Sequence, residues 1–174
     1  MNMKKLILFF LLILIIPFKS YSQGEVAKYK SIFTLSFIRY IGWPEESRQG
    51  DFVIGVVRNK EIADWLRSLS KGKRFGFQNV VIKEFRTPEE VTDCQVLYIG
   101  NVNLSKYAST LVDKVGGRNT LIISEKNGAT KYGSMINFII KEDKLKFEIQ
   151  KNNASKFGLQ ISSKLSGMAS AITL

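Results

Sequence analysis

Apolar residues recur along this chain with two different periods. Short β-branched runs occupy residues 52–57, 80–85, 95–99 and 120–124, and two alternating apolar and polar runs follow at 135–140 and 145–149. Each of these six runs predicts a β-strand. Near the start of the chain, by contrast, apolar residues return at three- and four-residue steps, which predicts one buried stripe of an amphipathic helix over 25–42. The stripe consists of Tyr29, Ile32, Phe33, Phe37, Tyr40 and Ile41.

Helical patterns fill most of the gaps between the predicted strands. The first covers residues 59–69 and opens at Asn59, a typical N-cap residue. A second covers 104–115, and a short helix is expected after Thr87. A final helical region, with a candidate break at Gly158, is predicted from about residue 153 to about residue 172.

This order of elements defines the expected fold class. Strands that alternate with helices of ten to fifteen residues indicate βαβ units and a parallel sheet. The last two strands are joined by the charged segment 141–144, which predicts an antiparallel hairpin beside the parallel strands. We therefore expect a single α/β domain with a mixed, mainly parallel sheet flanked by helices, in which a C-terminal β-hairpin is followed by a terminal helical region.

The first 22 residues have the composition of a secretory signal peptide. Lys4 and Lys5 precede an almost purely apolar run at 6–18, and small residues at Ser20 and Ser22 suit a cleavage site. The apolar run is shorter than the roughly 20 residues that span a bilayer. We predict cleavage after Ser22, which leaves residues 23–174 as one exported domain.

The charge balance is basic. The chain carries a formal charge of +11, and +8 remains once Lys4, Lys5 and Lys19 of the predicted signal peptide are removed. A basic exported protein with many surface lysines accounts for this excess, but so does attraction to anionic lipid head groups, a polyanion or an acidic partner. The loop 71–74, with its two lysines and one arginine, is the place where contact with lipid is in question. Export argues against nucleic acid as a partner.

Cysteine and histidine usage restricts the chemistry further. Cys94 is the single cysteine, so it forms no disulfide within the chain, and its position at the start of a strand favours a buried, inert thiol. The chain contains no histidine, which excludes Ser-His-Asp hydrolases and histidine-containing zinc sites. No paired carboxylates stand at a recognisable spacing, and we expect neither an enzyme nor a cofactor.

Four residues are candidates for contact with a ligand or partner: Arg39, Trp43, Asn137 and Lys164. Trp43 follows a helix end and precedes Pro44, where an indole ring usually packs over its own domain. Arg39 could present a positive charge at a binding cleft. Asn137 is an amide in a strand that looks buried, so it needs hydrogen-bond partners, and we expect it to connect the hairpin to the final helical region.

Several motifs, in order along residues 30–165, resemble the YfiR family of small periplasmic proteins (YfiR/HmsC-like). The opening helix ends in the family's aromatic "W-P" at Trp43 and Pro44, and three buried strands match at 52–56, 94–99 and 120–124. The most specific part lies in the last quarter of the chain. There the family patterns "G-x-M-I-N-F", "(V/L)-x-F-E-I" and "N…A…G-L-x-I-S-S-K-L" correspond to residues 133–138, 145–149 and 153–165.

The resemblance implies a periplasmic α/β regulator without enzymatic activity, often a homodimer. The best-known members of the family repress a membrane-bound diguanylate cyclase by binding its periplasmic sensor domain, so this is the function that we expect. Some members use additional cysteines in disulfides, and a single Cys94 does not support such a switch within the chain. The alternative is a periplasmic small-molecule sensor, which could feed a sensor histidine kinase and in which Arg39, Asn137 and Lys164 meet a small anionic ligand at the carboxyl ends of parallel strands.

Overall fold

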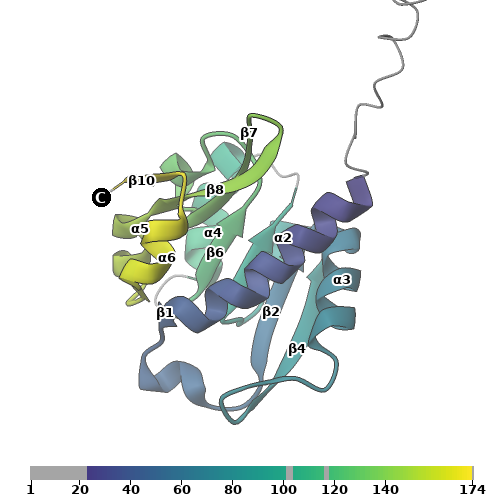
Figure 1. Ribbon diagram of the computed structural model, residues 1–174. Helices are drawn as coiled ribbons and strands as arrows, with labels where there is room; N and C mark the ends of the chain where they lie inside the picture. The colour runs from purple at the N-terminus through teal and green to yellow at the C-terminus, as the bar shows by residue number, and fades with distance from the viewer. Residues whose placement is uncertain (1–22, 101–103, 116–117, 174) are drawn as a thin grey trace, which may run out of the picture.

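The computed structural model describes residues 23–100, 104–115 and 118–173 (Figure 1). The predicted signal peptide therefore lies outside the described residues. The helices are α2 Gln23–Phe37, α3 Lys60–Ser70, α4 Leu104–Val115, α5 Lys151–Lys156 and α6 Ser163–Met168, with short 3₁₀ turns η1 Ile38–Tyr40, η2 Glu45–Arg48, η3 Pro88–Glu90 and η4 Ala129–Tyr132. The strands are β1 Ile41–Gly42, β2 Phe52–Val57, β3 Arg74–Phe75, β4 Gln78–Phe85, β5 Val96–Ile99, β6 Leu121–Ser124, β7 Ile136–Lys141, β8 Lys144–Gln150, β9 Gln160–Ile161 and β10 Ala171–Thr173.

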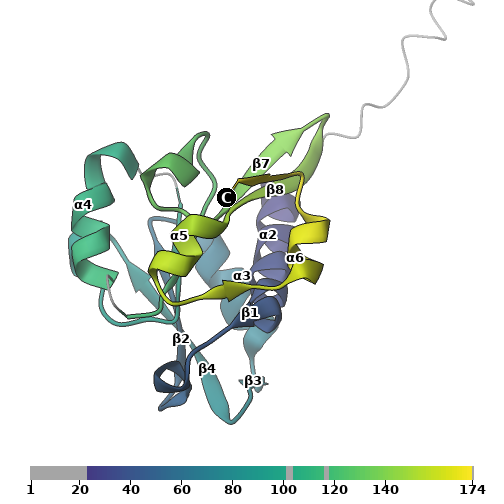
Figure 2. The ribbon, with the colours of Figure 1, turned by 90° about the vertical axis from the view of Figure 1, so that its left-hand side faces the viewer.

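One mixed sheet forms the centre of the domain. Its strand order is β10-β8-β7-β6-β5-β2-β4-β3, and the five strands from β4 to β7 are parallel to one another. Chain order reverses between β2 and β5, because α3 leads from β2 to β4 on one side while β5, β6 and β7 follow on the other. The helices α2 and α3 pack together on one face, and α4 lies on the opposite face (Figure 2). The expected α/β class with a mainly parallel sheet is confirmed.

The six predicted strands are all present, with bounds that differ from the prediction by at most two residues. The helix α3 opens as expected, since the Asn59 side-chain oxygen accepts a hydrogen bond from the backbone N–H of Ile62 at 3.1 Å. The hairpin of β7 and β8 is antiparallel and pairs Phe138 with Phe147. It is not the edge of the sheet, however, because β10 adds a further strand beside β8.

The prediction for the first helix is wrong in its length, and its apolar stripe is buried only in part, at Phe37 and Ile41. The α-helix ends at Phe37 and tightens into the 3₁₀ turn η1, after which Ile41 already belongs to β1. Its buried residues are Ala27, Ser31, Thr34 and Phe37, whereas Tyr29, Ile32 and Phe33 are 46%, 38% and 37% exposed. Small side chains allow α2 to approach α3 closely, and the Ser31 hydroxyl oxygen lies 3.5 Å from the carbonyl oxygen of Ile62.

The final helical region is also different from the prediction. It consists of two short helices, α5 and α6, separated by β9 and followed by β10. Gly158 adopts a φ of +69° after α5, where most side chains would be strained, and the chain then turns into an extended segment. The ladder between β9 and β1 pairs Ile161 with Ile41, a contact that local periodicity does not reveal.

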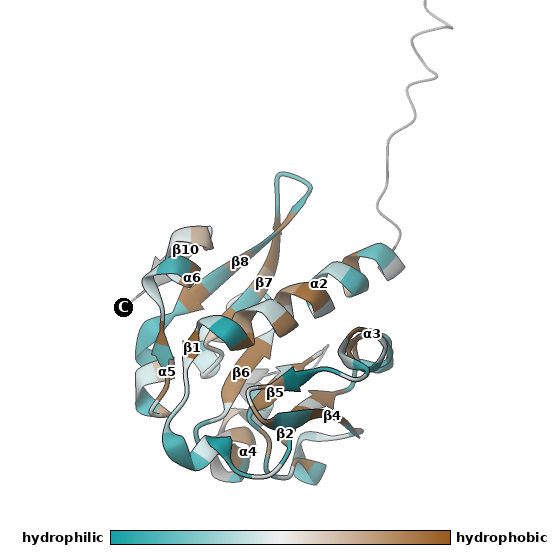
Figure 3. Ribbon diagram, turned by 60° about the horizontal axis from the view of Figure 1, so that its bottom comes forward, coloured by the Kyte–Doolittle hydropathy of each residue, from teal (hydrophilic) through white to brown (hydrophobic). Residues whose placement is uncertain are grey.

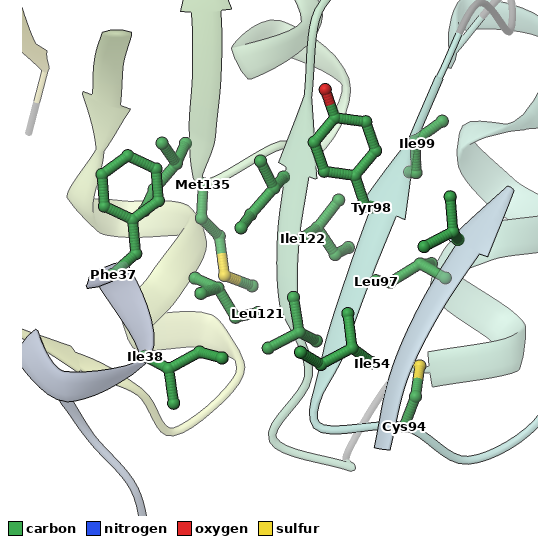
Figure 4. Close-up of a cluster of buried hydrophobic side chains, with 14 of the residues drawn as sticks. Phe37, Ile38, Ile54, Cys94, Leu97, Tyr98, Ile99, Leu121, Ile122 and Met135 are labelled. Carbon is green, nitrogen blue, oxygen red and sulfur yellow. The ribbon is translucent and has the colours of Figure 1, made fainter. Parts of the chain in front are cut away.

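The hydrophobic core lies on both faces of the central strands. All four residues of β5 are fully buried, as are Ile54, Leu121 and Ile123 on its neighbours. Figure 4 shows part of this core, with Ile54 of β2, Leu97 of β5 and Leu121 of β6 among the labelled side chains. Cys94 lies just before the amino end of β5 and Tyr98 near its carboxyl end in this view. The two ends of the sheet carry different polar groups, which are described below.

Candidate functional site

The carboxyl ends of the parallel strands are joined by a cluster of paired polar side chains around Glu125. This residue follows β6 directly, and its carboxylate accepts hydrogen bonds from three elements. The donors are Lys30 Nζ of α2 at 2.6 Å, Asn59 Nδ2 before α3 at 2.9 Å and the Tyr98 hydroxyl of β5 at 2.8 Å. Open α/β sheets usually bind ligands at this position, next to the reversal of chain order. In this domain the position is taken by the hydrogen-bonded side chains of Lys30, Glu125 and Tyr98.

Burial and the neighbouring carboxylate keep Tyr98 protonated. The phenol is fully buried, and this burial, together with the charge of Glu125 and their hydrogen bond, raises the pKa of Tyr98 well above its usual value. The hydroxyl therefore acts as a permanent donor to Glu125. Position 100, directly after β5, requires a glycine, because a Cβ atom there would lie 2.8 Å from Cβ of Asn59. This arrangement locks α2, α3 and the sheet together.

A second polar network surrounds Asn137 in β7. The residue is fully buried, and its Oδ1 accepts a hydrogen bond from the Ser124 hydroxyl at 2.7 Å while its Nδ2 donates to Glu148 at 2.9 Å. The Ser124 and Ser134 hydroxyl oxygens lie 2.6 Å apart. Asn137 thus connects β7 to β6 and β8. Our expectation that it fixes the hairpin to the final helical region is wrong; Asn153 of α5 supplies that link instead.

Asn153 makes the link through the segment that precedes β7. Its Nδ2 donates to the carbonyl oxygens of Thr130 at 2.7 Å and Ser134 at 2.9 Å. The motif residues of the hairpin are therefore structural: they satisfy buried polar atoms between three strands and one helix.

The other three candidate residues lie apart from Asn137. Trp43 is 7% exposed, donates from Nε1 to the carbonyl oxygen of Ile38 at 3.0 Å and packs edge-on against Phe52, as its position after a helix predicts. Lys164 of α6 lies over the ring of Tyr40, with Nζ 5.5 Å from the ring centroid. Arg39 is exposed on η1. Among the described contacts none joins two of the four, so the structure does not assemble them into one ligand site.

Arg39 instead meets the basic loop 71–74. A pocket of about 200 Å³ lies between the C-terminal ends of α2 and α3 and the start of β4, and Arg39, Lys73 and Arg74 all line it. Its apolar lining includes Leu69, Phe75 and Val80 (the lining is completed by Ile32, Leu35, Ser36, Ile38 and Ser70). This pocket is at the amino ends of β2 and β4, opposite to the cluster around Glu125. The sequence showed the two basic segments but not that they converge.

A broader depression of about 820 Å³ lies at the carboxyl ends of β2 and β4. Its lining includes charged residues of both signs. The basic ones are Arg58, Lys60 and Arg86, and the acidic ones are Glu84 and Glu90. Glu84 also forms an ion pair with Arg67, and the Glu90 carboxylate accepts the backbone N–H of Arg86 at 2.8 Å. The acidic groups are therefore engaged within the domain, and the depression has no uniform charge that would select an anion.

Exposed apolar residues occur on α2 and on the β7–β8 hairpin, two elements that both carry hydrophobic residues in Figure 3. On α2 they are Tyr29, Ile32 and Phe33. The ring of Phe33 stands 6.4 Å from that of Phe138 and 6.3 Å from that of Phe147, and Ile140, on the same face of β7 as Phe138, is 61% exposed. We call Tyr29, Ile32, Phe33 and Ile140 the α2 strip. The helical periodicity that predicted these α2 residues as buried identified the right residues but assigned them the wrong environment.

The fold and these surfaces define an α/β domain with a mixed, mainly parallel sheet. Among the described residues there is no group of three Cys, Asp or Glu that could hold a metal ion, and no described helix is long and apolar enough to cross a membrane. The chain belongs to the YfiR/HmsC-like family, whose model matches residues 27–170. This family supports, in general terms, a periplasmic regulator in cyclic-di-GMP signalling.

Comparison with solved structures supports the fold alone. A conserved domain protein from Vibrio cholerae O1 biovar El Tor superposes with a TM-score of 0.56 at 13% sequence identity. The match covers 84% of this chain and 60% of the other, so this chain spans less than two thirds of that protein's length. No curated protein matches the chain.

Proposed function

We propose that this protein is an exported regulator that binds and represses a membrane-bound signalling protein, most directly the periplasmic sensor domain of a diguanylate cyclase. Membership of the YfiR/HmsC-like family supports the signalling context. The single observation that carries the choice of a protein partner is the α2 strip, an exposed apolar surface on a domain whose other large apolar side chains are mostly buried.

The α2 strip has the features of an interface centre. Aromatic residues are enriched at the energetic centres of protein interfaces, and Tyr29 and Phe33 are both aromatic. Phe33 also rests on the buried rings of Phe138 and Phe147, so its side chain is already supported before a partner arrives. A surface that is ordered in advance loses less conformational entropy on binding.

Repression would follow from a shift in the partner's conformational equilibrium. A regulator that binds the inactive form of the sensor domain more tightly than the active form increases the inactive population. A differential affinity of about 2–4 kcal/mol is sufficient to change the output of such a two-state protein substantially. Release of the regulator by a signal would restore cyclase activity.

The test is co-purification from envelope extract. Tagged wild-type protein is expected to recover a membrane protein with a diguanylate cyclase domain, identified by mass spectrometry, and Phe33→Glu is expected to lose it. Met168→Glu is the matched control, because Met168 is an apolar residue with 50% exposure outside the α2 strip. Recovery of no cyclase by the wild type, or equal recovery by Phe33→Glu, would contradict the proposal.

The proposed homodimer is tested with the same variants. Light scattering after gel filtration gives the mass of the wild type and of Phe33→Glu. If the wild type is a dimer and Phe33→Glu a monomer, the α2 strip is the self-association face, and the partner must bind elsewhere or displace one subunit. If both proteins are dimers, the α2 strip remains free for the partner.

A further inference from the structure

The hairpin of β3 and β4 presents a fully exposed phenylalanine at its tip. Phe75 pairs with Gln78, so only Gly76 and Phe77 form the turn, and Gly76 has the positive φ of +58° that the first central residue of a type II′ turn requires. Phe77 is 100% exposed. Figure 2 shows β3 at the opposite end of the domain from the β7–β8 hairpin. An aromatic ring on a projecting turn makes no contribution to the core.

The segment of chain that carries Phe77 is strongly basic. From Trp65 to Lys83 the chain carries five basic residues and no acidic one. Lys71, Lys73 and Arg74 are exposed beside the turn, and none of them forms an ion pair with a described residue. Asp51 reaches the hairpin only through Asn79, whose Nδ2 lies 3.4 Å from its carboxylate.

The pocket next to this hairpin extends the basic surface inward. Arg39, Lys73 and Arg74 line it together with Leu69 and Phe75, so it offers several cationic donors above an apolar floor. A phosphate group with an attached glycerol or acyl segment has the matching chemistry: an anion for the guanidinium groups and an apolar portion for the floor.

The hairpin is also firmly supported. The Phe75 ring packs at a tilt against the Phe52 ring, with centroids 4.8 Å apart, and the Trp43 ring packs edge-on against Phe52 at 5.3 Å. The side chain of Gln78 is buried and donates to the carbonyl oxygens of Ser47 and Gln49, both at 3.2 Å. The exposed position of Phe77 is therefore imposed by a rigid base rather than by a loose loop.

We propose that the β3–β4 end of the domain docks on the surface of an anionic phospholipid bilayer. Phe77 enters the boundary between head groups and acyl chains, and Arg39, Lys71, Lys73 and Arg74 face the lipid phosphates. A bilayer suits this surface better than a protein partner, because a stable protein interface buries roughly 800 Å² on each side. A convex tip with one aromatic ring and a basic collar offers little such area, but it matches the amphipathic boundary of a membrane.

The experiment uses protein purified from the periplasm of an expressing host, with its N-terminus checked by mass spectrometry. Binding is measured by co-sedimentation with vesicles of phosphatidylcholine alone and of phosphatidylcholine with phosphatidylglycerol, at low and high salt. Binding is expected only to the anionic vesicles and is expected to weaken at high salt. Phe77→Ser should weaken it roughly tenfold, and Lys73→Glu with Arg74→Glu by roughly tenfold or more.

Two controls separate docking from general charge attraction. Lys141→Glu with Lys144→Glu makes the same charge change at the tip of the β7–β8 hairpin. Its affinity for anionic vesicles should fall only by the amount expected from the lower net charge of the protein, to within about twofold. Phe77→Trp adds an indole at the tip whose fluorescence should shift to the blue with anionic vesicles. Thermal melts of every variant establish that it is folded.

Three results would overturn the proposal. The first is equal binding by Phe77→Ser and the wild type, and the second is an equal loss from the two pairs of charge reversals. The third is binding of soluble glycerol phosphate in the pocket without any binding to vesicles, which would identify a site for a small anion instead. The experiment contains no protein partner, so its failure would leave the proposed regulatory function untouched.

Discussion

The two ends of the parallel sheet differ in how they use their polar residues. At the carboxyl ends of β5 and β6, Glu125 is paired with three donors and Tyr98 is fully buried. At the amino ends of β2 and β4, Arg39, Lys73 and Arg74 line an open pocket and Phe77 is fully exposed. The carboxyl end, where open α/β folds usually bind ligands, is here a structural joint. The exposed basic residues that line a pocket together with an apolar floor lie at the opposite end.

The helix α2 explains this difference. It lies across one face of the sheet and brings the Lys30 ammonium group to within 2.6 Å of the Glu125 carboxylate. Its other end leads into η1, which places Arg39 beside the loop 71–74. The segment formed by α2 and η1 therefore pairs the Glu125 carboxylate at one end of the sheet and adds a positive charge at the other end. Matched substitutions at the two ends of the sheet test this contrast.

The largest difference is expected in thiol reactivity. Burial raises the pKa of Cys94 from 9.0 to about 12, which lowers the thiolate fraction near neutral pH by roughly a thousandfold. Alkylation of the native protein by iodoacetamide should be slower than that of the urea-unfolded protein by at least this factor. Phe77→Cys in a Cys94→Ser background should react at the rate of an unfolded thiol. Both residues lie toward the amino ends of the parallel strands, because Cys94 precedes β5, so this test compares a buried with an exposed position at one end of the sheet. Similar rates at both positions would show that Cys94 is not shielded by the core.

The same pKa shift has a defined effect on stability. Above pH 9 the unfolded chain loses the thiol proton while the folded protein keeps it, so the folded state binds more protons than the unfolded state. The free energy of unfolding should therefore fall as pH rises from about 9 to about 12, and the contribution of this group is constant below pH 9. Cys94→Ala should show a smaller decline over this range in chemical denaturation.

Replacement of Asn137 by alanine should destabilise the fold more than the loss of any exposed polar side chain. It removes the partner of Ser124 and of Glu148 and leaves a cavity in a fully buried position. We expect a loss of about 2–4 kcal/mol in urea unfolding. Asn79→Ala, an exposed asparagine on β4, is the control and should cost less than about 0.5 kcal/mol. Equal effects would show that the Asn137 network is not a structural joint.

Glu125→Ala should have an intermediate effect. The substitution leaves Lys30 and Tyr98 without their acceptor in partly buried surroundings, and a cost of about 2 kcal/mol is expected. Arg74→Ala at the other end of the sheet should change the free energy of unfolding by less than about 0.5 kcal/mol. The comparison fails if Arg74 proves as important to stability as Glu125.

The smallest change is expected at Phe77. Phe77→Ala removes a ring that contacts nothing in the core, so the melting temperature should remain almost unchanged. Phe75→Ala, two residues earlier, removes the ring that packs against Phe52 and should cost about 2 kcal/mol. Loss of stability in Phe77→Ala would show that the ring is needed by the fold and is not free for a membrane.

The central strands were predictable because their signals are local. The runs at 52–57 and 120–124 are apolar and β-branched, and Asn59 is a strong N-cap, so each identifies its element without reference to the rest of the chain. The face of α2 was not predictable in this way. Its apolar residues surround much of the helix, and the choice of the buried side depends on how closely Ala27 and Ser31 let α3 approach.

The binding surfaces depend even more on distant contacts. The sequence indicates Arg39 and the loop 71–74 as basic, but only the fold brings them to one pocket. Asn137 was identified as a buried amide in need of partners, while its true partners follow from strand register. The division of the terminal region into α5, β9, α6 and β10 likewise follows from pairing with β1 and β8.

The β1–β9 ladder has a consequence for the order of folding. It joins Ile41 to Ile161, which are 120 residues apart, and β10 then adds the last described residues to β8. Contacts over such separations carry a high loop-closure cost and form late. We expect the strands at the two chain termini to form and open together, so that the backbone amides of β1 and β9 exchange with solvent as one cooperative unit ahead of β5.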